Sequence, residues 1–106
     1  MTLRSLGVLA ALAAFAAGCS QEPKLTAEAE RGRQVYQSQC IACHNPDPGQ
    51  PGAVGPAVRG SSPDLLRAKV VEGSYPPGYA PKRPTKVMQP MPPLANDIPA
   101  LAAYLR

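Results

Sequence analysis

Cys40-Ile41-Ala42-Cys43-His44 is the stretch that decides the fold of this 106-residue chain. Thiols three residues apart can reach the two vinyl groups of one porphyrin and form thioether bonds, and the histidine that follows can direct its imidazole at the iron. The spacing C-x-x-C-H is typical of c-type haem attachment. It predicts that Cys40 and Cys43 hold one covalent haem c, and that His44 is the proximal ligand of its iron.

Two other kinds of site use paired cysteines. A thiol–disulfide redox pair is expected beside a βαβ pattern, and the sequence shows no strand-like alternation. A structural zinc site needs four ligands. His44 is the only histidine of the chain, and the third cysteine, Cys19, ends an apolar leader. Haem therefore fits the sequence better than either alternative.

The N-terminal segment has the layout of a secretory signal. Arg4 precedes an almost unbroken apolar run over 6–17, which is short for a permanent membrane-spanning helix. Ala16-Ala17-Gly18-Cys19 resembles the lipobox of bacterial lipoproteins, in which the cysteine is acylated and becomes the first mature residue. Ala16 replaces the usual large aliphatic residue, so ordinary signal-peptidase cleavage is the alternative.

We expect residues 1–18 to be a signal peptide, 19–25 a lipid-anchored tether and 26–106 one folded domain. Acylation at Cys19 predicts an exported, membrane-anchored lipoprotein that faces the periplasm or the cell exterior. Without Arg4 the chain has ten basic and seven acidic side chains, a net charge of +3. This small, dispersed excess argues against nucleic acid as a partner and fits a mildly basic docking surface.

Three helical segments are expected, over 26–39, 62–73 and 96–105. Thr26 and Ser62 are suitable N-cap residues for the first two. The mature chain has 14 prolines, no tryptophan and, because the single phenylalanine lies in the leader, only four aromatic side chains. A domain this small is short of core, and a haem would fill its centre.

Residues 74–93 contain seven prolines and are expected to form a long loop. Loops of this length inside a compact domain are usually functional. Apart from Met1, the only methionines are Met88 and Met91, and both lie here. Because the chain has one histidine, the distal ligand is a methionine, a weaker ligand such as lysine or tyrosine, or no residue at all.

With these residues the chain resembles a class I cytochrome c over 26–106. Gly32 and Tyr36 resemble the Gly-x-x-x-aromatic pair on the first helix of that family, and Leu101 and Tyr104 the apolar–aromatic pair on its last helix. In the family these two helices cross at the glycine. The resemblance implies an all-α fold, with three to four helices wrapped around one covalent haem and a long proline-rich distal loop.

The segment from Gly55 to Gly60 is similar to the family's Gly-Pro-x-Leu-x-Gly pattern. There the proline carbonyl accepts the proton of the second nitrogen of the haem histidine, which fixes the ring. The resemblance gives that role to Pro56 and a haem-packing role to Val58.

The resemblance also favours Met88 as the distal iron ligand. Met88 stands 16 positions before Tyr104 and has Pro90 two positions after it, as in short bacterial members of the family. Met91 is the alternative, because Met-Pro-Pro often marks the ligand and Met91 is followed by Pro92 and another proline.

Five polar residues share the distal loop: Tyr75, Tyr79, Lys82, Arg83 and Lys86. The two haem propionates need hydrogen-bond donors, and the sequence leaves open which of these residues supplies them. The three cations are either a solvated surface or a positive rim at the haem edge that steers acidic redox partners.

The expected function is one-electron transfer by a His/Met-ligated haem c between membrane or periplasmic redox proteins. No catalysis and no small-molecule substrate are expected, because no carboxylate pair or nucleophile dyad lies near the motif. The alternatives are a gas sensor with an open sixth position, a permanent haem subunit of a larger oxidoreductase, and a peroxidase.

Overall fold

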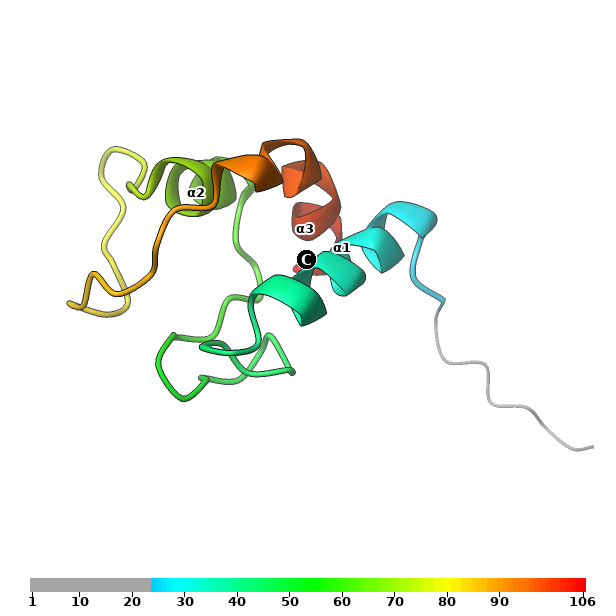
Figure 1. Ribbon diagram of the computed structural model, residues 1–106, viewed down its shortest axis with the longest axis horizontal. Coiled ribbons are helices and arrows are strands. Elements are labelled where there is room, and N and C mark those ends of the chain that lie inside the picture. Colours follow the sequence, from blue (N-terminus) through cyan, green and yellow to red (C-terminus); the bar gives the residue numbers. More distant parts are fainter. Residues whose placement is uncertain (1–23) are drawn as a thin grey trace, which may run out of the picture.

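A computed structural model describes residues 24–106 of the chain (Figure 1). Its elements, in chain order, are α1 (Ala27–Gln39), α2 (Pro63–Leu66), the π-helical segment η1 (Arg67–Val71), the 3₁₀ segment η2 (Pro92–Asp97) and α3 (Ile98–Tyr104). No strand occurs in this part of the chain, so the predicted all-α fold is confirmed. None of the helices between residues 24 and 106 is long and apolar enough to cross a bilayer. The predicted signal peptide and Cys19 lie outside the described residues.

Helix α1 begins where its N-cap predicts. The Thr26 hydroxyl accepts a hydrogen bond from the Ala29 amide at 3.1 Å, and Glu28 and Glu30 in the first turn stabilise the positive end of the helix dipole. The Arg31 guanidinium pairs with Asp97 of η2 at 2.7 Å. This ion pair joins the first helix to the segment that precedes the last.

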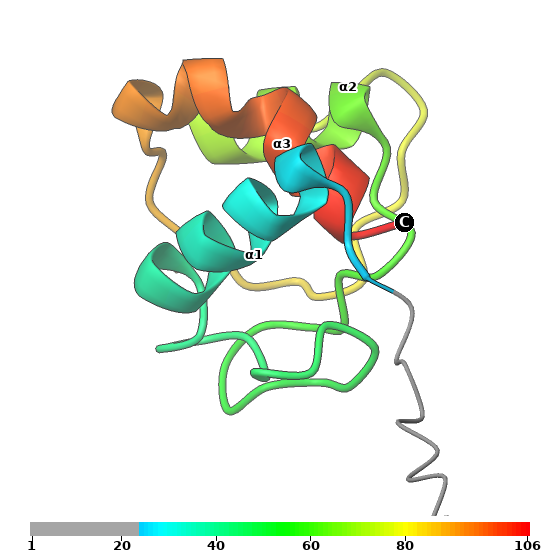
Figure 2. The same cartoon turned by 90° about the vertical axis from the view of Figure 1, so that its right-hand side faces the viewer.

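Helices α1 and α3 cross in close contact at a glycine (Figure 2). A β-carbon on Gly32 would overlap the backbone carbonyl of Ala100 and come within 2.9 Å of the Tyr104 Cβ. Beside the crossing, the rings of Tyr36 and Tyr104 lie 5.7 Å apart between centroids. The helix crossing that the family resemblance implied is therefore present, and Gly32 is required by sterics.

The core lies on one side of this crossing. Its most deeply buried side chains are Tyr36, Ile98, Leu101 and Leu105. Leu66 of α2 and Val70 of η1 complete the same apolar cluster. All three helical regions thus contribute to one core, and its partly buried margin includes both methionines of the distal loop.

The second helical region differs from the regular helix expected over 62–73. Ser62 does cap it, accepting from the Leu65 amide at 3.1 Å, but only four α-helical residues follow before the backbone widens into η1. At its end the Val70 carbonyl accepts a hydrogen bond from the Met91 amide at 2.6 Å. This bond joins the end of the helical region to the distal loop, and Gly73 ends the region at φ 68°.

The last helical region also starts differently from the expectation. Pro92 and Pro93 have no amide hydrogen to donate, and the chain forms the 3₁₀ segment η2 there, in which the Leu94 amide donates to the Met91 carbonyl at 3.0 Å. Regular α-helix begins at Ile98, slightly later than predicted. The distal loop is correspondingly shorter than 74–93 and ends at Met91.

Candidate haem-binding site

One cavity of about 380 Å³ lies between the end of α1, the 52–58 segment and the distal loop. Most of its wall is apolar. It is lined by every site residue that the sequence predicts within the described part of the chain: Cys40, Cys43, His44, Pro56, Val58, Met88 and Met91. The structure therefore gathers, around one cavity, residues that lie up to 51 positions apart in the sequence.

The two cysteines lie on a turn that follows α1 directly. The Cys40 amide donates to the Tyr36 carbonyl at 2.9 Å, and the Cys40 carbonyl in turn accepts from the His44 amide at 2.9 Å. The two thiols are not joined in a disulfide. Burial raises the pKa of the Cys40 thiol to about 11. A lowered pKa activates the attacking thiol of a thiol–disulfide redox pair, and the pKa of Cys40 is shifted in the opposite direction.

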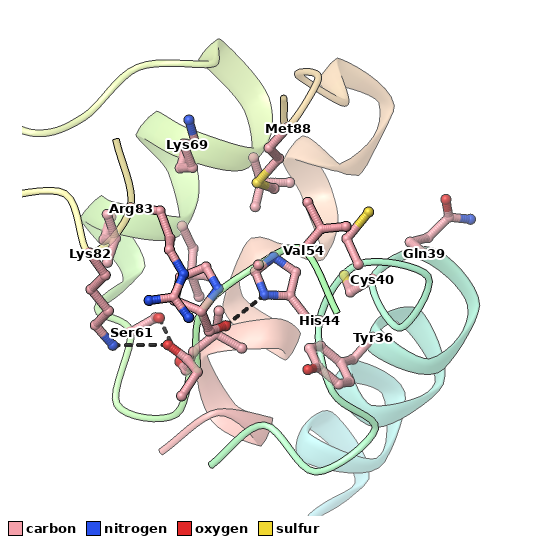
Figure 3. A pocket seen from close by; sticks show the side chains of 18 of the residues that line it. Tyr36, Gln39, Cys40, His44, Val54, Ser61, Lys69, Lys82, Arg83 and Met88 are labelled. Carbon is pink, nitrogen blue, oxygen red and sulfur yellow. Dashed lines mark hydrogen bonds between the residues drawn. The ribbon is translucent and has the colours of Figure 1, made fainter. Parts of the chain in front are cut away.

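The His44 ring is oriented by a backbone carbonyl. Its Nδ1 lies 2.8 Å from the Pro56 carbonyl oxygen, which can only accept, so Nδ1 carries the proton and Nε2 keeps its lone pair. Figure 3 shows the ring and the Met88 sulfur directed into the same space. This arrangement leaves one imidazole nitrogen free to bind a metal.

Two glycines form a support behind the histidine. A β-carbon on Gly55 would lie 2.5 Å from the His44 Cε1, and one on Gly52 would lie 2.6 Å from the Asn45 amide nitrogen. The amide of Gly55 also donates to the Cys43 carbonyl at 2.9 Å. Sequence reasoning gave Gly52 no role beyond the loop. The sequence feature that could have revealed its role is the G-x-x-G spacing just before Pro56. Two glycines at this spacing allow the 52–55 turn to lie against the backbone of the haem-attachment motif.

The two methionines that line the cavity differ in how their backbone is held. Both are half-buried and pack at the margin of the core. Met88 lies in the loop and its sulfur points into the cavity (Figure 3). Met91 is fixed through its own backbone to Val70, at the start of η2. Both candidates for the distal ligand thus lie on the cavity wall.

One part of the cavity wall is cationic. Lys69, Lys82 and Arg83 line it, and none of its described lining residues is an aspartate or a glutamate. The Lys69 ammonium lies 4.4 Å from the centre of the Tyr75 ring, which stacks on Tyr79 at 5.4 Å. Of the polar loop residues that the sequence singles out, only Lys86 lies off the lining.

The residues present fit a haem. An apolar cavity suits the porphyrin plane, the cationic and phenolic groups suit two propionates, and two unpaired thiols beside a single imidazole suit thioether attachment. No cluster of three or more histidine, cysteine or acidic side chains in residues 24–106 is placed to hold a metal ion by itself. The donor set therefore matches a porphyrin iron better than a bare ion.

The fold and the cavity together place this protein in the class of c-type cytochromes. The sequence matches the family model described as cytochrome c oxidase, cbb3-type, subunit III, over residues 27–105, and the chain belongs to this family. Neither the curated proteins nor the solved structures include a significant match. Membership implies covalently bound haem c with its iron, which supplies one-electron exchange between Fe(II) and Fe(III).

Proposed function

We propose that this protein is an exported, membrane-tethered electron carrier that passes single electrons between redox proteins on the outer side of a membrane. Cys40 and Cys43 hold the haem by thioether bonds, His44 is the proximal ligand and Met88 the distal one. A reduced partner protein donates one electron and an oxidised partner accepts it, with no bond made or broken in either partner.

The observation that carries this proposal is that His44 and Met88 line the same cavity. His44 enters from the turn after α1 with Nδ1 already engaged, and Met88 enters from the distal loop with its sulfur facing the same space. A thioether is a weak ligand that stabilises Fe(II), and filling both axial positions favours electron transfer over binding of gases or peroxide.

Charge on the distal loop supports docking to acidic partners. Residues 73–96 contain Lys82, Arg83 and Lys86 and no acidic residue, and all three cations are exposed. Complementary charges raise the rate at which redox partners meet. The loop that carries the distal methionine is therefore also the proposed docking surface.

Export and anchoring rest on the sequence of the leader. In the proposal Cys19 is acylated, and the residues that follow allow the domain to reach partners at the membrane surface. Replacement Cys19→Ser should release the domain into the soluble fraction or stop processing of the leader. Recovery of wild-type protein in the soluble fraction after osmotic shock would contradict the anchor and leave the haem site unaffected.

A second candidate is a fixed haem subunit of a terminal oxidase. Membership of the family of cbb3-type cytochrome c oxidase subunit III favours it, because that subunit is part of an oxidase. The same cavity would serve in both cases. Mild detergent extraction separates them: a carrier elutes from a sizing column near the mass of one chain, whereas a fixed subunit co-elutes with haem-containing partners.

Potentiometric titration of the purified protein tests the carrier function itself. The haem should be reduced and reoxidised reversibly in a single one-electron step. A step that does not reverse, or one that needs a bound small molecule to proceed, would contradict the proposal.

A further inference from the structure

Within the part of the chain that the structure describes, the distal loop makes few polar contacts with other segments, and one of these contacts reaches the segment beside His44. Residues 80–90 make a single hydrogen bond with the other residues of the described range 24–106: the Lys82 ammonium donates to the Ala57 carbonyl at 2.9 Å. Backbone bonds resume only at Met91. This stretch includes Met88.

The other end of that hydrogen bond lies in the segment that orients the histidine. Ala57 directly follows Pro56, whose carbonyl accepts from His44. Gly55, one residue earlier, lies against the imidazole ring. Figure 3 shows the Lys82 side chain reaching this segment beside the His44–Pro56 bond. Lys82 therefore connects the loop of the distal ligand to the support of the proximal one.

We propose that Lys82 is a positioning residue that holds the distal loop closed, so that Met88 stays on the iron. The inference rests on the proposed His/Met ligation. Three prolines, Pro81, Pro84 and Pro90, limit the conformations open to the loop, but they do not attach it to the 55–58 segment. The ammonium supplies that attachment, and its loss frees the loop to move as a stiff unit away from the cavity.

The test is displacement of the methionine by imidazole in the oxidised holoprotein. Sulfur-ligated ferric haem has a weak far-red absorption band, and imidazole can bind only after the loop opens. Lys82→Leu keeps part of the aliphatic stem and removes the donor, and it adds no sulfur to the cavity wall. Because a net hydrogen bond of this kind contributes about 1 kcal/mol, the rate at which imidazole abolishes the band should rise about fivefold.

Two matched variants separate positioning from charge. Lys86→Leu removes the same charge from the same loop without touching a hydrogen bond, and its exchange rate should stay within about twofold of wild type. Lys82→Arg keeps a donor and should restore slow exchange. Equal rates in Lys82→Leu and Lys86→Leu would overturn the positioning role. A wild-type protein with no far-red band would overturn the His/Met proposal as well, so the two failures are distinguishable.

Discussion

At the scale of single residues, the imidazole of His44 is fixed from two directions. The Pro56 carbonyl accepts from Nδ1 at 2.8 Å, and Gly55 lies against the ring where no side chain would fit. Such outer contacts set the tautomer and the direction of a ligand. They leave the distal side as the variable part of the site, and two methionines compete for it.

The methionine pair gives the sharpest prediction at this scale. Met88→Ala should abolish the far-red band of the oxidised protein and lower its reduction potential, because loss of a soft, neutral thioether disfavours Fe(II). Met91→Ala should keep the band, with a modest shift from altered packing. The reverse pattern would transfer the ligand role to Met91, and a band retained in both variants would mean that either sulfur can bind.

The buried hydroxyl of Tyr36 should make the stability of the fold depend on pH. Its hydroxyl donates to the Asn45 carbonyl at 2.5 Å, and burial, as the main cause, raises its pKa from 10.0 to about 12. The folded state therefore holds this proton more tightly than the unfolded state. The contribution to the free energy of unfolding is complete below the unfolded pKa and is lost as pH rises through the folded one.

The comparison of wild type with Tyr36→Phe isolates this effect from other titrating groups. In denaturant unfolding of the holoprotein, wild type should lose about 2 kcal/mol relative to the variant between roughly pH 9 and pH 12. The phenylalanine ring keeps the packing against Tyr104 and cannot titrate. A stability difference that stays constant over this range would show that Tyr36 is not the group responsible.

At the scale of elements, the α1–α3 crossing should be the least tolerant contact of the fold. Gly32→Ala raises helix propensity by about 1 kcal/mol, but its methyl group would overlap the Ala100 carbonyl. Overpacking of this kind costs about 1–3 kcal/mol. We expect a net loss of stability in thermal or urea unfolding. Gln34→Ala, exposed on the same helix, should change stability by less than about 0.5 kcal/mol.

Local signals explain which elements the sequence predicts well. Helix α1 has its cap, its acidic first turn and its crossing glycine within its own residues, and its observed bounds agree with the prediction. The π-helical segment η1 includes Val70, whose carbonyl accepts a hydrogen bond from the Met91 amide, twenty-one positions away. No local pattern encodes such a contact, so a regular helix was the natural but incorrect expectation there.

The residues of the candidate site also fall into those that a local pattern predicts and those that depend on distant contacts. Cys40, Cys43 and His44 are contiguous and carry a motif with one geometry, whereas Pro56 and Val58 could be assigned only through a family resemblance. Gly52 escaped notice because its role is to leave room for the backbone at Asn45, a contact that appears only after the turn has formed. Lys82 was recognised as a cation, but its carbonyl partner could not be read from the sequence.

At the scale of the whole molecule, charge is distributed unevenly around the cavity. The cations of the distal loop predict faster reaction with anionic oxidants. Oxidation of the reduced protein by ferricyanide should slow as salt is added, because salt screens exposed charges. Lys86→Glu should slow it at low salt more than Lys24→Glu, which reverses an exposed charge near the start of the domain. Equal effects would contradict docking through the loop.

The central claim is that both axial positions are filled and that the protein carries electrons instead of binding ligands. Exposure of the reduced wild-type protein to carbon monoxide tests it most directly, because carbon monoxide binds ferrous haem rapidly only at an open position. If Met88 fills the sixth position, the spectrum should not change over minutes. An immediate shift of the main absorption band would show an open sixth position, contradict ligation by either methionine and support a gas sensor.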